Sequence, residues 1–187
     1  MGNAPMTFFT VGHSTRSAEE FLDILHAHGI RRLVDVRRFP GSRRHPHFSR
    51  ESLARLLPAH GIAYDHAPDL GGRRTPAPDS PNDGWRSASF RAYADYMQTP
   101  EFDRALGSLL AGADERVTAI MCAEAVHWRC HRQLIADALV ARGHEVRNIL
   151  SAERAEPHHL SPHARVGPGG TVTYPASAGD DAQASLF

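Results

Sequence analysis

Short apolar runs alternate with amphipathic segments through the first 150 residues of the chain. Five of the runs have the length of buried strands and lie at residues 8–11, 30–36, 62–64, 117–122 and 145–150. Between them, apolar residues recur at the three- and four-residue spacing of helices. Strands that alternate with helices predict an α/β fold, with a mainly parallel sheet of about five strands and helices on both faces.

Polar residues at the ends of the amphipathic segments predict where the helices begin and end. Ser17 and Glu20 form a capping box at the start of the first helix, and Gly29 has the position of a residue that ends it. Ser49 is expected to cap the second helix. The other helices are predicted at residues 90–97, 100–110 and 130–142.

Two segments lack apolar periodicity. Residues 75–86 are rich in proline, aspartate and serine and predict a long mobile loop. From about residue 155, proline, glycine, alanine, serine and histidine dominate. We therefore expect a single α/β domain over residues 1–154. Residues 155–187 are expected to be an ordered segment that gives way to a flexible Pro/Gly/Ala-rich tail.

Composition limits the function classes that fit. The chain has 187 residues, of which 41% are apolar, and this suits one domain with a sizeable core. Its 21 cationic and 21 anionic residues balance, so any nucleic-acid site must be a local patch. All the cationic residues are arginine, whose planar guanidinium suits phosphate or carboxylate. Neither a signal peptide nor a membrane span is evident, so we expect a cytoplasmic protein without membrane association.

Polar groups follow the predicted strands at their carboxyl ends, where parallel sheets bind ligands. These groups are His13 and Ser14 after the first strand, Asp35 and Arg37 after the second, Gly71, Gly72 and Arg73 after the third, and Cys122 and Glu124 after the fourth. We expect them to meet at one edge of the sheet and to form the functional site.

Two carboxylates at this edge suggest acid–base chemistry. Asp35 and Glu124 could divide the general acid and base roles if their environments separate their pKa values. The alternative for Asp35 is a structural ion pair with Arg37 or Arg132. Arg37, Arg43 and Arg132 can each bind a phosphate through two hydrogen bonds. The alternative is that adjacent arginines, such as Arg37-Arg38 and Arg43-Arg44, form a solvent-exposed surface without a ligand.

Both cysteines of the chain lie in the segment after the fourth strand. They do not make a disulfide framework in a chain of this size. Cys130, at a predicted helix start beside His131 and Arg132, is a candidate reactive thiolate, and a buried structural thiol is the alternative. A zinc site with Cys122 and a further histidine, His13 or His127, is less consistent with the spacing of the cysteines. We therefore expect no metal and no cofactor.

Four short motifs carry a family resemblance, and they follow one another along the chain. They are Gly12-His13-Ser14; Asp35-Val36-Arg37 with Pro40 and Ser42-Arg43; Leu70-Gly71-Gly72 with Arg73; and Met121-Cys122-Ala123-Glu124 followed by Cys130-His131-Arg132. Together they resemble the family called domain of unknown function 488 (DUF488), over roughly residues 10–150. The resemblance implies an α/β domain with these motifs gathered at one site, and it implies no particular reaction.

The last five residues give a separate indication. Gln183-Ala184-Ser185-Leu186-Phe187 is similar to the peptide by which bacterial polymerases and repair proteins dock on the sliding clamp. In such a peptide Gln183 would enter a polar pocket, while Leu186 and Phe187 would fill an apolar groove. A chance pentapeptide, or one that packs on its own domain, is the alternative.

These observations lead to one main hypothesis. We expect an enzyme of DNA repair or DNA-base metabolism, hydrolytic at a nucleobase or N-glycosidic bond and recruited to the clamp, with Trp85 or Trp128 stacked on the base. A cysteine-dependent enzyme on a small phosphorylated metabolite and a non-catalytic nucleic-acid or nucleotide-binding module are the alternatives. The expected catalytic residues are His13, Asp35, Cys122 and Glu124, and the expected substrate or phosphate ligands are Ser14, Arg37, Arg43, Gly71, Gly72, Arg73, Cys130, His131 and Arg132.

Overall fold

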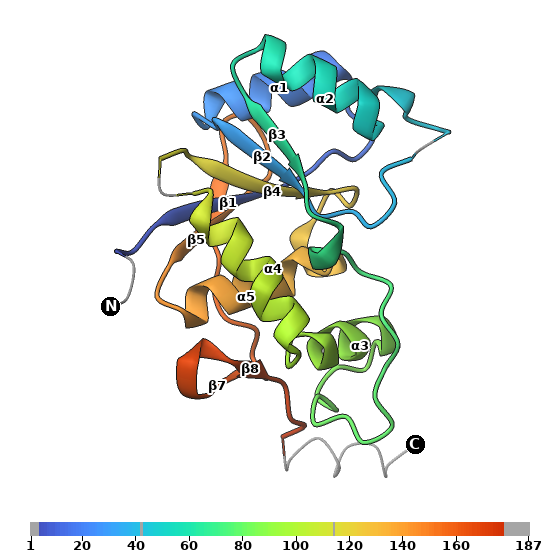
Figure 1. Cartoon of the computed structure of the whole chain (residues 1–187), viewed down its shortest axis with the longest axis vertical. Coiled ribbons are helices and arrows are strands. Elements are labelled where there is room, and N and C mark those ends of the chain that lie inside the picture. Colours follow the sequence, from blue (N-terminus) through green and yellow to red (C-terminus); the bar gives the residue numbers. More distant parts are fainter. Residues whose placement is uncertain (1–3, 42, 114, 178–187) are drawn as a thin grey trace.

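A computed structural model describes residues 4–41, 43–113 and 115–177 of the chain. Its main sheet has the strand order β3-β2-β4-β1-β5-β6 (Figure 1). The first five strands are parallel, and β6 pairs antiparallel with β5. The strands are β1 (Thr7–Gly12), β2 (Arg32–Asp35), β3 (Ala63–His66), β4 (Thr118–Cys122), β5 (Glu145–Ile149) and β6 (Ala155–Pro157). The predicted α/β class with a mainly parallel sheet is confirmed.

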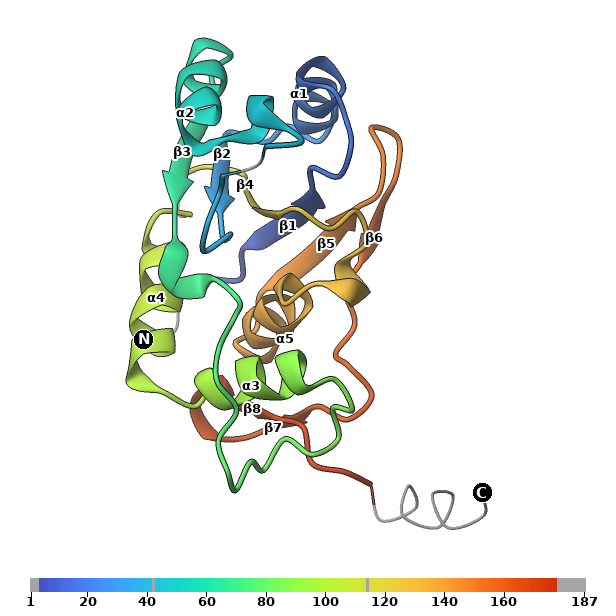
Figure 2. The same ribbon diagram turned by 90° about the vertical axis from the view of Figure 1, so that its right-hand side faces the viewer.

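Helices cover both faces of this sheet. Helices α1 and α2 lie on one face, and α3, α4 and α5 lie on the other (Figure 2). No helix in the described part of the chain is both long enough and apolar enough to span a bilayer. The helices are α1 (Ala18–Ala27), α2 (Arg50–Ala59), α3 (Ala88–Tyr96), α4 (Pro100–Ala111) and α5 (Arg132–Ala141).

The side chains of each strand alternate between two separate hydrophobic cores. In β2, Leu33 packs in the core under α1 and α2, whereas Val34 packs in the core under α3, α4 and α5. In β4, Met121 belongs to the first core and Cys122 to the second. This alternation determines which face of the sheet each polar side chain at a strand end occupies.

The helix boundaries follow the predicted capping residues. Ser17 and Glu20 make both hydrogen bonds of the capping box at α1, and Ser49 caps α2. Gly29 ends α1 with a φ of 66°, a backbone conformation that glycine adopts without strain. Helix α5 begins at Arg132 instead of Cys130, because residues 127–129 form a separate short 3-10 turn.

The described residues 155–177 form the expected ordered segment, and they continue the fold beyond the expected domain boundary at residue 154. This segment contributes β6 to the main sheet and forms a two-stranded sheet of β7 (Arg165–Val166) and β8 (Val172–Thr173). Tyr174 is fully buried against the core beside α5. Sparse apolar residues and buried polar side chains anchor the segment, and neither produces a periodic pattern. The predicted clamp peptide, residues 183–187, lies outside the described residues.

The proline-rich loop of residues 75–86 is also anchored in place. Asn82 is fully buried and donates a hydrogen bond of 2.8 Å to Asp95 of α3. Its side-chain oxygen accepts a hydrogen bond of 2.9 Å from the backbone N–H of Tyr174. The predicted long loop is present without helix or strand, and single polar side chains connect it to α3 and to Tyr174.

Candidate active site

Loops from four strands meet at the carboxyl edge of the sheet. The register places Asp35 beside Met121 and Gly12 beside Cys122. The backbone N–H of Ser14 donates to the carbonyl of Ala123 at 2.9 Å, which joins the loops after β1 and β4. Ser14 and Arg73 are the non-glycine residues with positive φ in the described chain, at 51° and 59°. Strained backbone of this kind is common at functional sites.

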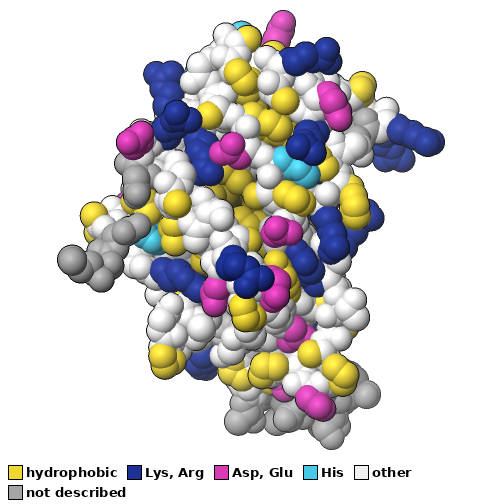
Figure 3. All heavy atoms as spheres, in the orientation of Figure 1, with side chains coloured by type: hydrophobic (Ala, Val, Ile, Leu, Met, Phe, Trp, Pro, Cys, Tyr) yellow, Lys and Arg dark blue, Asp and Glu magenta, His cyan; other side chains and the backbone are white. Residues whose placement is uncertain are grey.

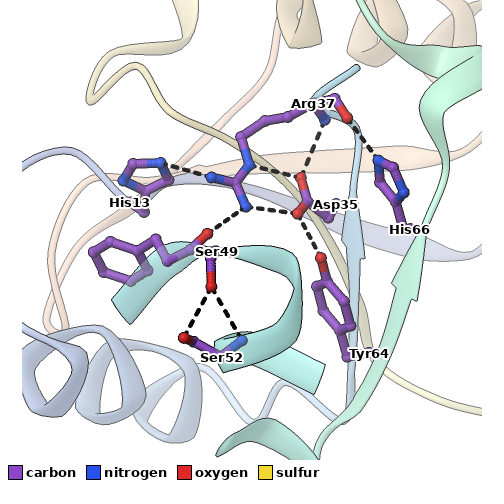
Figure 4. Close-up of polar contacts among 8 residues, drawn as sticks. His13, Asp35, Arg37, Ser49, Ser52, Tyr64 and His66 are labelled. Atoms are coloured by element: carbon purple, nitrogen blue, oxygen red, sulfur yellow. Dashed lines mark hydrogen bonds and ion pairs between the residues drawn. The ribbon is translucent and has the colours of Figure 1, made fainter. Parts of the chain in front are cut away.

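On the α1–α2 face of the sheet, Asp35 holds Arg37 in a buried ion pair (Figure 4). The Arg37 Nε donates to Asp35 Oδ1 at 2.8 Å, and Nη2 donates to Oδ2 at 2.7 Å. The Tyr64 hydroxyl donates a 2.6 Å hydrogen bond to Oδ2, and the Arg37 backbone N–H donates to Oδ1 at 3.1 Å. Asp35 thus accepts four hydrogen bonds and has no exposed surface.

The imidazole of His13 completes this network. An arginine can only donate, so the 3.2 Å contact between Arg37 Nη1 and His13 Nε2 makes Nε2 the acceptor. His13 Nδ1 then carries the proton and donates to the Ser14 carbonyl at 2.8 Å. Burial, together with the Arg37 charge, lowers the pKa of His13 to about 4, while the hydrogen bond to Ser14 opposes that shift. His13 is therefore neutral at pH 7, with both ring nitrogens occupied.

These contacts favour structural roles for Asp35 and His13 over the predicted catalytic ones. A general base must reach the proton that it abstracts, but the two oxygens of Asp35 are saturated and His13 is 3% exposed. The alternative in which Asp35 forms a structural ion pair with Arg37 fits the geometry. Most of the donors of Arg37 are also occupied, since Nη2 donates to the Phe48 carbonyl at 2.8 Å as well.

A pocket of about 330 Å³ opens next to this network. The loops after β2, β3 and β4 line it, and Phe39 at its rim is 65% exposed. The guanidinium groups of Arg38 and Arg73 both lie over the Phe39 ring, at 5.9 and 5.6 Å from its centre. In Figure 3, arginine side chains lie along the right-hand edge of the molecule, and others are scattered over the rest of this face. The lining residues are Arg37, Arg38, Phe39, Gly72, Arg73, Cys122, Ala123, Glu124, Cys130 and His131.

Behind the pocket wall, Arg132 is buried without an ionic partner. Its guanidinium is 1% exposed and donates to Cys122 Sγ at 2.7 Å and to the backbone carbonyls of Glu124 and Ala125 at 2.6 and 3.1 Å. It forms no ion pair with a described carboxylate, and its Nε has no hydrogen-bond partner among the described atoms. Burial lowers the pKa of Arg132 to about 10, against the opposing charge of Glu124.

The two cysteines lie together in the pocket wall. Cys122, at the end of β4, is bonded to Cys130 as a disulfide. His131 Nδ1 lies 3.6 Å from Cys130 Sγ, and Nε2 lies 3.3 Å from the Val36 carbonyl, to which it can only donate. Burial lowers the pKa of His131 to about 4, so this ring is neutral at pH 7 with Nδ1 as its acceptor.

The structure divides the predicted site residues between these two environments. The pocket includes Arg37, Gly72, Arg73, Cys122, Glu124, Cys130 and His131, whereas His13, Ser14, Asp35, Arg43, Gly71 and Arg132 are not among its lining residues. Gly71 packs against Arg38, where a side chain would clash. Trp85 packs against Phe90 and Tyr174 and is not among the residues that line the pocket. The described residues contain no group of three or more ligand side chains placed to hold a metal ion.

Sequence reasoning missed Arg38 and Phe39 as lining residues. Both follow Arg37 directly, in a loop that begins at the end of β2. Phe39 precedes Pro40 and was interpreted only as part of a loop. An aromatic residue next to arginines in a proline-containing loop was the available signal, because such a side chain has no core to join.

We expect Gly12→Ala to disrupt the site. A Cβ at this position would overlap the backbone carbonyl of Glu124, so the segment that carries Cys122 and Glu124 must move. Overpacking of this kind costs about 1–3 kcal/mol. The free energy of unfolding, measured by urea denaturation, should fall by that amount. Gly107→Ala, on α4 with open space around a new Cβ, is the control and should leave stability unchanged or higher.

Acid should destabilise the protein through His13 and His131. Both have pKa values of about 4 in the folded chain, against an ordinary 6.5. Between these pH values the unfolded chain binds more protons, so stability falls as the pH drops from 6.5 to about 4 and does not change through these groups above 6.5. Urea denaturation at pH 7 and pH 4.5 measures the loss. His13→Asn should show a weaker pH dependence, and an equal dependence would contradict the assignment.

Comparison with known proteins identifies the family of the chain. Residues 17–139 match the family described as domain of unknown function DUF488. Neither the curated proteins nor the solved structures contain a match. All the residues that line the pocket lie within the matched span. Because this span covers more than half of the 187 residues, the chain belongs to the DUF488 family.

Proposed function

We propose that the protein is a hydrolytic enzyme that acts on a nucleobase or N-glycosidic bond in DNA. The observation that carries this proposal is the pocket itself, which combines the Glu124 carboxylate, a wall of arginines and the exposed ring of Phe39. Its volume of about 330 Å³ is at the lower end of ligand sites. A single extruded nucleotide fits a site of this size and polarity better than an extended polymer does.

The rim of the pocket supports recognition of a nucleic-acid strand. Phe39 offers a face on which a base can stack, and a stacked base contributes about 1–3 kcal/mol. Arg38 and Arg73 flank that ring and can each bind a phosphate. Arg43 is exposed in the same loop as Phe39. This local patch explains how a chain with zero net charge could bind DNA.

Within the pocket, Glu124 is the carboxylate best placed for catalysis. It is exposed, it lines the pocket, and it follows β4 directly. Its carboxylate can take a proton from a water molecule that attacks the substrate. Asp35 supports the reaction indirectly, because it fixes the position of Arg37 in the pocket wall.

Recruitment to DNA is assigned to residues 183–187. Docking of this peptide on a bacterial sliding clamp would raise the local concentration of the domain at DNA. It also requires a cytoplasmic location. A pull-down with the clamp should retain the full chain and lose a chain truncated after Ala182.

A panel of damaged and mismatched DNA duplexes tests the activity. We expect turnover of at least one substrate, and a loss of about 100-fold or more for Glu124→Gln, the range of one general base. Glu115→Gln is the control, because Glu115 is exposed before β4, at the opposite end of that strand.

The DNA affinities of variants of the rim residues, measured with the same duplexes, test the role of the rim in binding. Phe39→Ala should weaken binding by about tenfold. Arg38→Ala should reduce the salt dependence of binding by about one counterion, whereas Arg116→Ala, at the other end of the sheet, should not. If no duplex is bound or converted by the wild-type chain, the proposal is wrong.

A further inference from the structure

The burial of Arg132 needs a compensating negative charge. A buried guanidinium without a counter-ion costs several kcal/mol, and no described carboxylate lies within ion-pair distance of Arg132, although the charge of Glu124 acts on it from farther away. Its Nη1 points at Cys122 Sγ, 2.7 Å away. A thiolate on Cys122 would supply the missing charge in direct contact. Once the disulfide with Cys130 is reduced, this contact therefore favours the ionised form of Cys122.

From this geometry we propose that Cys122 and Cys130 form a thiol–disulfide exchange site, with Cys122 as the nucleophile and Cys130 as the resolving cysteine. Its substrate class is a disulfide that carries a carboxylate or a phosphate. This proposal does not depend on the DNA substrate proposed above. It also replaces the sequence-based candidate thiolate, Cys130, with Cys122.

The surroundings of the two sulfurs assign their roles. Cys122 contacts the permanent cation of Arg132, which lowers a thiol pKa. Cys130 faces the neutral ring of His131, whose Nδ1 can accept a hydrogen bond from the protonated thiol but has too low a pKa to remove its proton. Cys130 is also not the first residue of α5, which begins at Arg132, so the helix terminus acts on it less than predicted. In the reduced protein Cys122 is therefore the thiolate, and Cys130 stays a protonated thiol until a stronger base takes its proton.

The exchange balances without a metal or a cofactor. The Cys122 thiolate attacks one sulfur of the substrate disulfide, the S–S bond breaks, and the first thiolate leaves. The departing thiolate takes the proton of Cys130, and the Cys130 thiolate attacks the Cys122 sulfur, releases the second thiolate and forms the Cys122–Cys130 disulfide. Two electrons pass from the two cysteines to the substrate. A small thiol reductant then restores the dithiol by the reverse exchange.

The pocket lining selects for anionic partners. Arg37, Arg38 and Arg73 line the pocket, and Cys122 and Cys130 lie in its wall. Glu124 is the acidic side chain among the lining residues. A substrate with a carboxylate or phosphate near its disulfide can therefore bind the arginines while its sulfur reaches Cys122.

The pH dependence of alkylation tests the thiolate. The chain is reduced, the reductant is removed, and the rate of Cys122 alkylation by iodoacetamide is followed by mass spectrometry in Cys130→Ser. We expect a midpoint at or below about pH 7, compared with about 8.5 for a free thiol. Arg132→Met should raise the midpoint and Arg132→Lys should restore most of the shift. Met fills similar buried space without a charge. A midpoint near 8.5 in the parent variant overturns the proposal.

Two coloured disulfides test the exchange and its selectivity. We expect 5,5′-dithiobis(2-nitrobenzoate), which carries carboxylates, to react faster than the neutral 2,2′-dithiodipyridine, and Arg38→Ala with Arg73→Ala to remove the preference. The reduced wild type should release two coloured thiols per chain, whereas Cys130→Ser should release one and remain as a mixed disulfide. Equal release by both chains would disprove the resolving role. The exchange assay contains no DNA, so the two proposals fail separately: exchange without DNA turnover contradicts only the hydrolytic proposal, and DNA turnover without exchange contradicts only this one.

Discussion

Asp35→Asn should destabilise the protein by about 3–5 kcal/mol, the cost of breaking a buried ion pair by removing one charge. The reason is the network on the α1–α2 face of the sheet. Asp35 accepts four hydrogen bonds, three of them from Arg37, and the guanidinium of Arg37 is almost as deeply buried. An amide would direct N–H groups at donors and leave the Arg37 charge uncompensated. Urea denaturation at pH 7 measures the change.

Two further variants give stability changes with which the loss in Asp35→Asn can be compared. Tyr64→Phe removes one neutral donor to Asp35 and should cost about 1 kcal/mol. Glu101→Gln breaks the ion pair with Arg104 on the surface of α4, where both side chains are more than half exposed, and should change stability little. If Asp35→Asn is no more damaging than Tyr64→Phe, Asp35 does not carry the charge that holds Arg37, and a catalytic role for Asp35 becomes open again.

Much of the fold could be predicted because its signals are local. The capping box of Ser17 and Glu20, the cap at Ser49 and the glycine after α1 are contained in a few neighbouring residues, and each works as expected. The five parallel strands are short apolar runs between helices, and that order alone requires crossovers and a parallel sheet. Because ligands bind at the carboxyl ends of parallel strands, the meeting of the polar residues at this edge could also be predicted.

The division of the site could not be predicted, because the parallel strands are apolar on both faces. In a half-buried strand the alternation of apolar and polar residues shows which side chains share a face, but a strand covered on both faces has no such alternation. Leu33, Val34 and Asp35 are all buried. The sequence therefore could not show that Asp35 faces α2 while Cys122 faces α5. The two were assigned to one crevice, although they belong to neighbouring environments.

The role of the segment after β5 was also hidden, for a different reason. Its anchor is a chain of polar contacts between residues far apart in sequence. The Thr10 hydroxyl donates to Asn148 Oδ1 at 2.7 Å, so the amide nitrogen of Asn148 donates to His158 Nδ1 at 3.1 Å. His158 Nε2 then carries the proton and donates to Asp137 at 2.8 Å. These contacts connect β1 and β5 to α5 across one core.

Asp137 on α5 collects the remaining polar groups of that segment. Its Oδ1 accepts hydrogen bonds from His158 and from the Ser161 backbone N–H, and its Oδ2 accepts from the hydroxyls of Ser161 and Tyr174 at 2.6 and 2.8 Å. Asp137 has no exposed surface. Burial and the neighbouring Asp137 charge raise the pKa of Tyr174 well above its ordinary value, so the phenol remains a donor. One carboxylate thus holds several points of residues 158–174 against the helix.

Asp137→Ala should therefore cost about 3–5 kcal/mol, because it leaves buried donors without acceptors. Asp137→Asn should cost about 1–2 kcal/mol: the amide oxygen can replace Oδ1, and the two hydroxyls at Oδ2 can rotate to accept from the amide nitrogen. Asp103→Ala, an exposed carboxylate on α4, should cost much less. Hydrogen exchange should show faster exchange in Asp137→Ala at residues 155–177, with smaller changes in α1 and α2. A uniform loss of protection would mean that this segment unfolds only together with the whole domain, and that Asp137 supports the fold as a unit instead of anchoring one edge of it.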